Sequence, residues 1–299
     1  MNRYLKIVVG SILVELILAF ITFMGYISYS LTRVVRTPVK ESPADLGLKY
    51  EDVSFPSHKD HLTIRGWYLP GGKEDRCIIM VHGGERHRGD PFIGMLNIAQ
   101  RLVENNYSVL MFDMRARGES EGKRSSLGYY ERYDLKGAIN YVIERGISTP
   151  RIGILGFSMG AAVALLVAAE DFPTLPVVAD SSYADLPELV MDEASKRIDL
   201  PRFFNLGWIY MSRLMYGVEL NALRPVEAVH KLAPHRLLLI HGEEDEAIPV
   251  RHAYRLLAAS HNASQNLWVV PEAGHAKSFR RRPDEYISRV VSFFDANLS

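Results

Sequence analysis

Residues 151–170 restrict the possible folds of this chain more than any other stretch. They read RIGILGFSMGAAVALLVAAE, a short β-branched apolar run followed by a glycine-flanked serine and an Ala/Leu/Val-rich run. The central residues, Gly156-Phe157-Ser158-Met159-Gly160, form the pattern G-x-S-x-G. A serine between a buried strand and a helix adopts a strained backbone conformation, and flanking glycines let the strand and helix approach this tight turn. The stretch therefore predicts a strand, a sharp turn and a helix, with Ser158 exposed as a nucleophile.

Strand and helix patterns alternate from Tyr50 to the C-terminus. Besides the strand before Ser158, we predict strands over residues 50–55, 62–69, 77–81, 109–112, 177–180, 236–240 and 267–270. Helical spacing follows most of them, notably over residues 93–102, 130–145, 161–170, 250–260 and 284–297. Tight turns at Pro56-Ser57 and Pro70-Gly71-Gly72 indicate an antiparallel start. The remaining alternation predicts an α/β fold with a mostly parallel sheet and helices on both faces.

The alternation stops between residues 183 and 234, where three helical segments and no strand are predicted. Asp185 and Glu188 form a capping pattern at the start of the first segment. The second segment, Phe203–Val218, is rich in aromatic residues and methionine. An insertion at this point would cover the mouth of the sheet as a lid. Two interpretations are open: the apolar face lines an acyl pocket, or it only packs on the domain surface.

Candidate catalytic groups follow separate strands, where loops at the carboxyl ends of parallel strands meet. Ser158 is the candidate nucleophile, His275 the base that takes its proton, and Asp245 the carboxylate that orients the imidazole. The backbone N–H groups of Met159 and Gly84 would bind the oxyanion of the tetrahedral intermediate. The order Ser…Asp…His is the one that accompanies a G-x-S-x-G turn.

Several residues have competing interpretations. Asp180 also ends a strand and is the alternative to Asp245 as the residue that orients His275. We expect His82 to brace its own loop, and His241 to form the turn that carries Asp245. Ser181 and Ser182 lack flanking glycines and are interpreted as loop residues.

The N-terminus carries a separate signal. Ile7–Tyr29 is apolar except for Glu15 and is long enough to cross a bilayer core of about 30 Å as a helix. A cleaved signal peptide is the alternative, although its apolar region would normally be about 7–15 residues. We favour an uncleaved single-pass anchor over residues 1–30, a spacer over 31–49 and a catalytic domain over 50–299. The flanking positive charges leave the side of the membrane that holds this domain undetermined.

Composition excludes some classes of partner. The chain has 35 Lys+Arg and 35 Asp+Glu, so its net charge gives no electrostatic case for nucleic acid as a partner. The single cysteine, Cys77, lies in an apolar run and cannot form an intramolecular disulfide. It is interpreted as a small core residue.

Five motifs in order resemble the α/β-hydrolase superfamily, and more narrowly its membrane-tethered serine hydrolases with a short helical lid. They are Val81-His82-Gly83-Gly84, residues 112–120 (FDMRARGES), Gly156–Gly160, His241–Asp245 with Ile248-Pro249, and Gly274-His275. The resemblance runs from about Tyr50 to the C-terminus. It implies an eight-stranded, mostly parallel sheet, a triad of Ser158, Asp245 and His275, an oxyanion hole at Gly84 and Met159, and no cofactor or metal.

These observations lead to one main functional prediction. We expect a serine hydrolase that cleaves carboxylic esters or thioesters, lipid-like or acylated, through an acyl-enzyme intermediate. An amidase or peptidase of the same fold is the alternative within the enzymes. A non-catalytic binding protein of this fold is the alternative outside them, although it would be expected to lack one of the catalytic groups.

Overall fold

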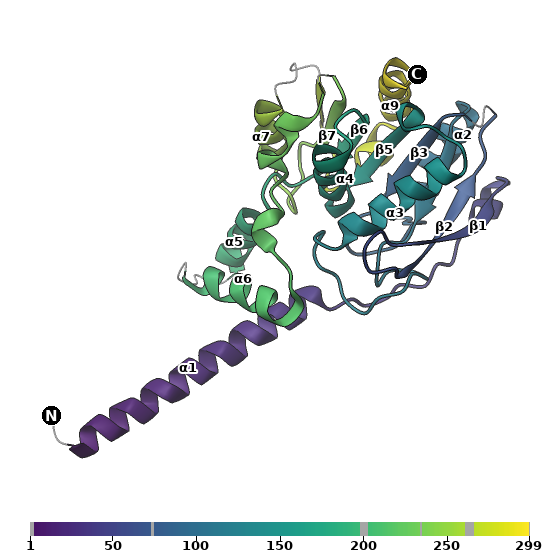
Figure 1. The fold of residues 1–299 in the computed structure, drawn as a ribbon. Helices are drawn as coiled ribbons and strands as arrows, with labels where there is room; N and C mark the ends of the chain where they lie inside the picture. The colour runs from purple at the N-terminus through teal and green to yellow at the C-terminus, as the bar shows by residue number, and fades with distance from the viewer. Residues whose placement is uncertain (1–2, 73–74, 198–202, 234, 261–265, 299) are drawn as a thin grey trace.

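The structure is a computed structural model of the 299-residue chain, shown in Figure 1. It describes residues 3–72, 75–197, 203–233, 235–260 and 266–298, and for residues 193–197 and 203–206 the backbone alone.

A single eight-stranded sheet forms the centre of the described fold. Its strands are β1 (Glu51–Pro56), β2 (Thr63–Leu69), β3 (Cys77–Val81), β4 (Ser108–Phe112), β5 (Ile152–Phe157), β6 (Val177–Asp180), β7 (Leu237–Gly242) and β8 (Leu267–Val270). They lie in the order β1-β2-β4-β3-β5-β6-β7-β8. The pairs β1–β2 and β2–β4 are antiparallel and all others are parallel. The predicted mostly parallel, eight-stranded α/β fold is thus confirmed, with strand ends shifted by one or two residues at most.

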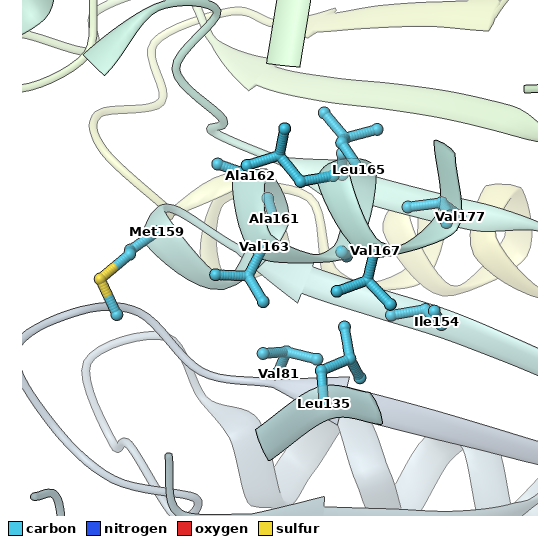
Figure 2. Packing of buried hydrophobic residues seen from close by; sticks show 14 of the residues in the cluster. Val81, Leu135, Ile154, Met159, Ala161, Ala162, Val163, Leu165, Val167 and Val177 are labelled. Carbon is cyan, nitrogen blue, oxygen red and sulfur yellow. The ribbon is translucent and has the colours of Figure 1, made fainter. Parts of the chain in front are cut away.

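Helices cover both faces of the sheet because its strands are apolar on both sides. Alternate residues of β3 show this: Cys77, Ile79 and Val81 face one core cluster, and Ile78 and Met80 face the other. The first cluster includes α3 (Glu131–Glu144) and α4 (Met159–Asp171), and the second includes α2 (Met95–Glu104) and α9 (Pro283–Asn297). Figure 2 shows apolar residues of α4 and of strands β3, β5 and β6 packed in the first cluster. Two further helices are α7 (Arg251–Ala259) and α8 (Ser278–Arg281), the latter not predicted from sequence.

The helical insertion, residues 183–234, lies between β6 and β7. It contains α5 (Leu186–Arg197) and α6 (Phe203–Tyr216), followed by short 3₁₀ turns at Leu220–Ala222, Pro225–Glu227 and Val229–Lys231. The predicted third helical segment thus consists of three short 3₁₀ turns, and no strand lies among the described residues of the insertion. The N–H of Glu188 donates to the Asp185 carboxylate at 3.0 Å, as the capping pattern indicates.

The N-terminal helix α1 (Arg3–Thr32) projects from the domain (Figure 1). It is long and apolar enough to cross a membrane, and its residues 9–19 are all exposed. Its C-terminal turns contact α6, and Met24, Ser28 and Thr32 are its buried residues. Beyond α1, residues 33–49 follow the surface of the domain, with a 3₁₀ turn at Pro43–Leu46.

Candidate active site

Ser158 lies in the turn between β5 and α4. Its backbone has φ 54° and ψ −121°, a region that non-glycine residues rarely adopt and that costs free energy. A Cβ on Gly160 would lie 2.4 Å from the carbonyl oxygens of both Val81 and His82. Only glycine therefore lets α4 start this close to the end of β3. The same local geometry turns Ser158 out of the sheet at the start of the helix.

The structure brings Ser158, His275 and Asp245 into one hydrogen-bonded row. His275 Nε2 lies 2.9 Å from Ser158 Oγ, and His275 Nδ1 lies 2.8 Å from Asp245 Oδ2. Asp245 follows β7, and His275 follows β8, so the two loops meet above the end of β5. The Asp245 side chain is fully buried, whereas that of His275 is 25% exposed.

The Asp245 carboxylate is held by several donors. Its Oδ1 accepts the N–H groups of Ala247 and Ile248 at 3.0 and 2.8 Å. His241 Nε2 lies 3.3 Å from Oδ2 and also 2.7 Å from the carbonyl oxygen of Ile248. Burial by itself would raise the pKa of Asp245, but the hydrogen bonds from His241 and His275 outweigh it. The net shift is downward, so the carboxylate is ionised at neutral pH.

The glycine loop after β3 faces the start of α4. A Cβ on Gly83 would be 3.5 Å from Ser158 Cβ, and one on Gly84 would be 3.4 Å from Met159 Sδ. Met159 is the first residue of α4, where helical N–H groups have no partner within the helix. Arg117 donates from Nε at 2.6 Å, and also from Nη2, to the carbonyl oxygen of Gly84. Gly84 and Met159, the two predicted oxyanion-hole residues, are therefore neighbours beside Ser158.

The alternative residues have other partners. Asp180 Oδ1 accepts hydrogen bonds from Ser181 at 3.0 Å and from Ser278 at 3.3 Å, and no described hydrogen bond joins it to His275. Ser181 Oγ in turn accepts the N–H of Ala276, next to His275. His82 is buried and bonds to its own loop rather than to Ser158. Asp180 and Ser181 thus support the loop that carries His275.

A pocket of about 820 Å³ opens above Ser158 and His275. Apolar side chains of Ile93, Leu186, Leu189 and Ile248 line part of it. The insertion contributes to the wall through Tyr183 and α5, whereas no described side chain of α6 reaches it. The described side chains of the aromatic- and Met-rich second segment therefore do not line this pocket, which argues against the interpretation that they line an acyl pocket.

Sequence reasoning missed three contributors to the site. His241 touches the Asp245 carboxylate directly, beyond forming its turn, and Arg117 holds the Gly84 loop. Residues 30, 31 and 33–35, just beyond or within the end of α1, line the pocket. In the sequence, only the polar motif around Arg117 and the His-Gly pair at 241–242 pointed to these residues. Neither motif indicates that Arg117 contacts Gly84 or that His241 contacts the Asp245 carboxylate.

Two other features bear on reactive groups. Cys77 is fully buried, and burial raises the pKa of its thiol to about 12, which fits its interpretation as a core residue. Within the part of the chain that the structure describes, no group of three or more His, Cys, Asp or Glu side chains could hold a metal ion.

Comparison with known proteins places these features in a wider context. Residues 72–179 match the family described as serine aminopeptidase, S33. The protein YqkD of Bacillus subtilis is 26% identical over 78% of this chain and 75% of its own length. Monoglyceride lipase of Rattus norvegicus is 25% identical over 76% of this chain and 84% of its own length.

A solved structure shares most of the fold. The esterase Pf2001 of Pyrococcus furiosus superimposes with a TM-score of 0.72 at 26% identity, over 89% of this chain and 100% of its own. Together with the sheet order, the position of the insertion and the serine turn, this likeness shows that the chain belongs to the α/β-hydrolase superfamily.

Proposed function

We propose that the protein is a serine hydrolase that cleaves carboxylic esters through an acyl-enzyme intermediate. The observation that carries the proposal is the row of contacts from Ser158 Oγ to His275 Nε2 at 2.9 Å and from His275 Nδ1 to Asp245 at 2.8 Å. A serine hydroxyl is a weak nucleophile until a base accepts its proton, and this geometry supplies the base and the group that orients it.

The proposed reaction begins when Ser158 Oγ attacks the ester carbonyl carbon and its proton passes to His275 Nε2. The carbonyl oxygen becomes an oxyanion, which the N–H groups of Gly84 and Met159 stabilise. Asp245 stabilises the imidazolium through Nδ1. When the intermediate collapses, the C–O bond to the leaving group breaks and Nε2 returns the proton to the alcohol. Water then attacks the acyl-enzyme with His275 again as base, which releases the acid and restores Ser158.

Esters are favoured over amides by the named relatives. An esterase of known structure and a monoglyceride lipase each resemble most of this chain. The apolar wall formed by Ile93, Leu186, Leu189 and Ile248 suits an acyl chain. Amide hydrolysis is the second candidate because the matching family is described as a serine aminopeptidase. Both reactions would use the same three side chains.

We also propose that α1 is an uncleaved membrane anchor. Ser28 Oγ donates to the carbonyl oxygen of Trp208 at 3.2 Å and lies 3.1 Å from Ser212 Oγ. Met24 and Ser28 are 1% and 0% exposed. Cleavage near Ser30 would remove these contacts and expose the α6 surface that they cover, which favours an anchor over a signal peptide.

Labelling with a fluorophosphonate probe tests the catalytic proposal. Wild type should be labelled, Ser158→Ala should not, and Ser292→Ala, an exposed serine on α9, should be labelled like wild type. Failure of wild type to react, or equal labelling of Ser158→Ala, contradicts the proposed nucleophile.

A substrate panel then decides the reaction class. Esters, thioesters and amides of increasing acyl length are compared by kcat/KM for wild type and Ser158→Ala. We expect Ser158-dependent turnover of esters to exceed that of the matched amides. Faster amide turnover would replace the ester proposal with the amidase alternative.

A further inference from the structure

Helices α1 and α6 form a closely packed pair. A Cβ on Gly207 of α6 would lie 2.8 Å from Phe20 Cζ and 2.7 Å from Met24 Sδ, so the absence of a side chain lets the helices touch. A Cβ on Gly25 of α1 would lie 3.8 Å from Met215 Sδ of α6, which is an ordinary van der Waals contact. With the hydrogen bonds of Ser28, these contacts run along successive turns of α1. The position of α1 in a membrane therefore determines that of α6.

The depth of the pair follows from the charges that flank α1. Lys6 precedes the apolar stretch and Arg33 follows it, so the segment that crosses a bilayer core lies between them. A core of about 30 Å takes about 20 helical residues, and any such run within this stretch includes Phe20 and Met24. Both residues contact Gly207. The adjoining part of α6 is consequently at the level of lipid chains, below the headgroups.

The side of α6 next to this contact is apolar and uncovered. Tyr210 is 66% exposed and Leu214 is 80% exposed, and their spacing of four residues puts them on one face. Such an exposed face would be unfavourable in water but suits the boundary of a bilayer. Arg33 supplies positive charge at the level expected for lipid headgroups, whereas Arg213, 64% exposed, is paired with Glu219 at 2.8 Å.

The pocket adjoins the same end of α1. Ser30 and Leu31, in the last turn of α1, line it together with Val34 and Val35, and Ser158 and His275 lie on its inner side. Val35 is 73% exposed and Leu31 is 37% exposed. Leu31, Val34 and Val35 are thus the apolar residues, beside Ser30 and Arg33, in the part of the lining that the end of α1 supplies.

We propose that α6 lies beside the C-terminal turns of α1 in one lipid leaflet and that the pocket takes its ester from that leaflet. The occupant of the exposed α6 face is the hydrocarbon boundary of the membrane that α1 crosses. The substrate class is an ester-bearing lipid whose acyl chain passes along Leu31 and Val35 to Ser158. The statement about substrate rests on the proposed function, whereas the statement about α6 does not.

The first test measures the depth of α6 with an environment-sensitive thiol dye in the full chain reconstituted in nanodiscs. Cys77 is fully buried, so the dye reports introduced thiols. The variants are Leu214→Cys on α6, Leu13→Cys on α1 as the membrane reference, and Ser292→Cys on α9 as the aqueous reference. We expect the dye at residue 214 to emit at shorter wavelength and to be quenched by spin-labelled lipids, as at residue 13.

Two results overturn the proposal for α6. In the first, the dye at residue 214 would behave like the dye at residue 292, which would place α6 in water. In the second, the dye at residue 214 would emit at shorter wavelength but would not be quenched by spin-labelled lipids, which would indicate a second protein copy on this face. Neither result depends on hydrolysis, so this test stands apart from the test of the catalytic proposal.

The second test addresses the source of the substrate. Leu214→Glu and the matched control Ser292→Glu are assayed on a monoacylglycerol in bilayers and on a short water-soluble ester. For Leu214→Glu, the ratio of bilayer to soluble activity should fall about tenfold, the factor expected from loss of one buried apolar side chain. The ratio for Ser292→Glu should match that of wild type. A ratio that is the same for both variants contradicts delivery from the leaflet, even if soluble esters are cleaved.

Discussion

The Nδ1 atom of His82 lies 2.6 Å from the carbonyl oxygen of Gly83. The N–H of Met114 donates to His82 Nε2 at 2.9 Å, so in the neutral ring the hydrogen is on Nδ1 and is donated to Gly83. Burial lowers the pKa of His82 to about 4, which keeps the ring neutral at physiological pH. The Gly83 carbonyl and the Gly84 N–H belong to one planar peptide. The imidazole therefore orients the N–H that we propose as an oxyanion donor.

Replacement of His82 by alanine should lower kcat about 100-fold with little change in KM, because a misdirected oxyanion donor weakens binding of the transition state alone. Steady-state kinetics on a soluble ester measure this. His252→Ala is the matched control, since His252 is also buried and its pKa is also lowered to about 4. If the two variants lose kcat equally, the effect of His82 is general destabilisation rather than orientation.

Replacement of Asp245 by asparagine should reduce kcat about 10³- to 10⁴-fold, because an amide cannot hold the imidazole tautomer or stabilise its charged form. Asp180→Asn should cost far less, since Asp180 bonds to Ser181 and Ser278 instead of His275. Parallel kcat measurements on both variants compare the two carboxylates. A larger loss for Asp180→Asn would reverse the proposed assignment.

Replacement of Gly160 by alanine should lower the free energy of unfolding by at least about 1–3 kcal/mol, the usual cost of overpacking. The new Cβ would be 2.4 Å from two backbone oxygens at the end of β3, which cannot rotate away as a side chain could. Denaturant unfolding in detergent measures the change. Gly10→Ala is the control because nothing lies within 4 Å of its Cβ position, and equal stability of the two variants would argue against the close approach.

The stability of the protein should depend on pH through Asp180. Burial raises the pKa of Asp180 to about 6, and the hydrogen bond from Ser181 offsets this only in part. The folded state thus keeps a proton that an unfolded aspartate loses near pH 3.9. The resulting stabilisation is complete below about pH 4 and is lost as the pH rises to about 6.

Asp180→Asn removes this titration and so isolates it. The free energy of unfolding of wild type minus that of Asp180→Asn should fall by about 2–3 kcal/mol between about pH 4 and 7. Denaturant titrations at several pH values measure the difference. A difference that is constant or rises with pH would show that the folded pKa of Asp180 is not raised.

Local patterns were sufficient to predict the sheet and the positions of the candidate catalytic groups. The apolar run Cys77–Val81 is a strand with the predicted bounds, and Ser158 occupies the predicted turn. These predictions succeeded because burial on both faces and a tight glycine turn each impose a composition on neighbouring residues. Parallel strands also bring their carboxyl ends to one edge, so Asp245 and His275 could be expected near Ser158 before their contacts were known.

The sequence by itself determined the α/β class, the strand–turn–helix at Ser158 and an apolar N-terminal helix. Only the tertiary structure decided that His241 contacts Asp245, that Arg117 holds Gly84 and that α1 packs on α6. The last two contacts join residues distant in the chain, and all three depend on side-chain direction. No local periodicity encodes such pairings, because an arginine or a small residue suits many partners. The packing of complete elements selects one of them.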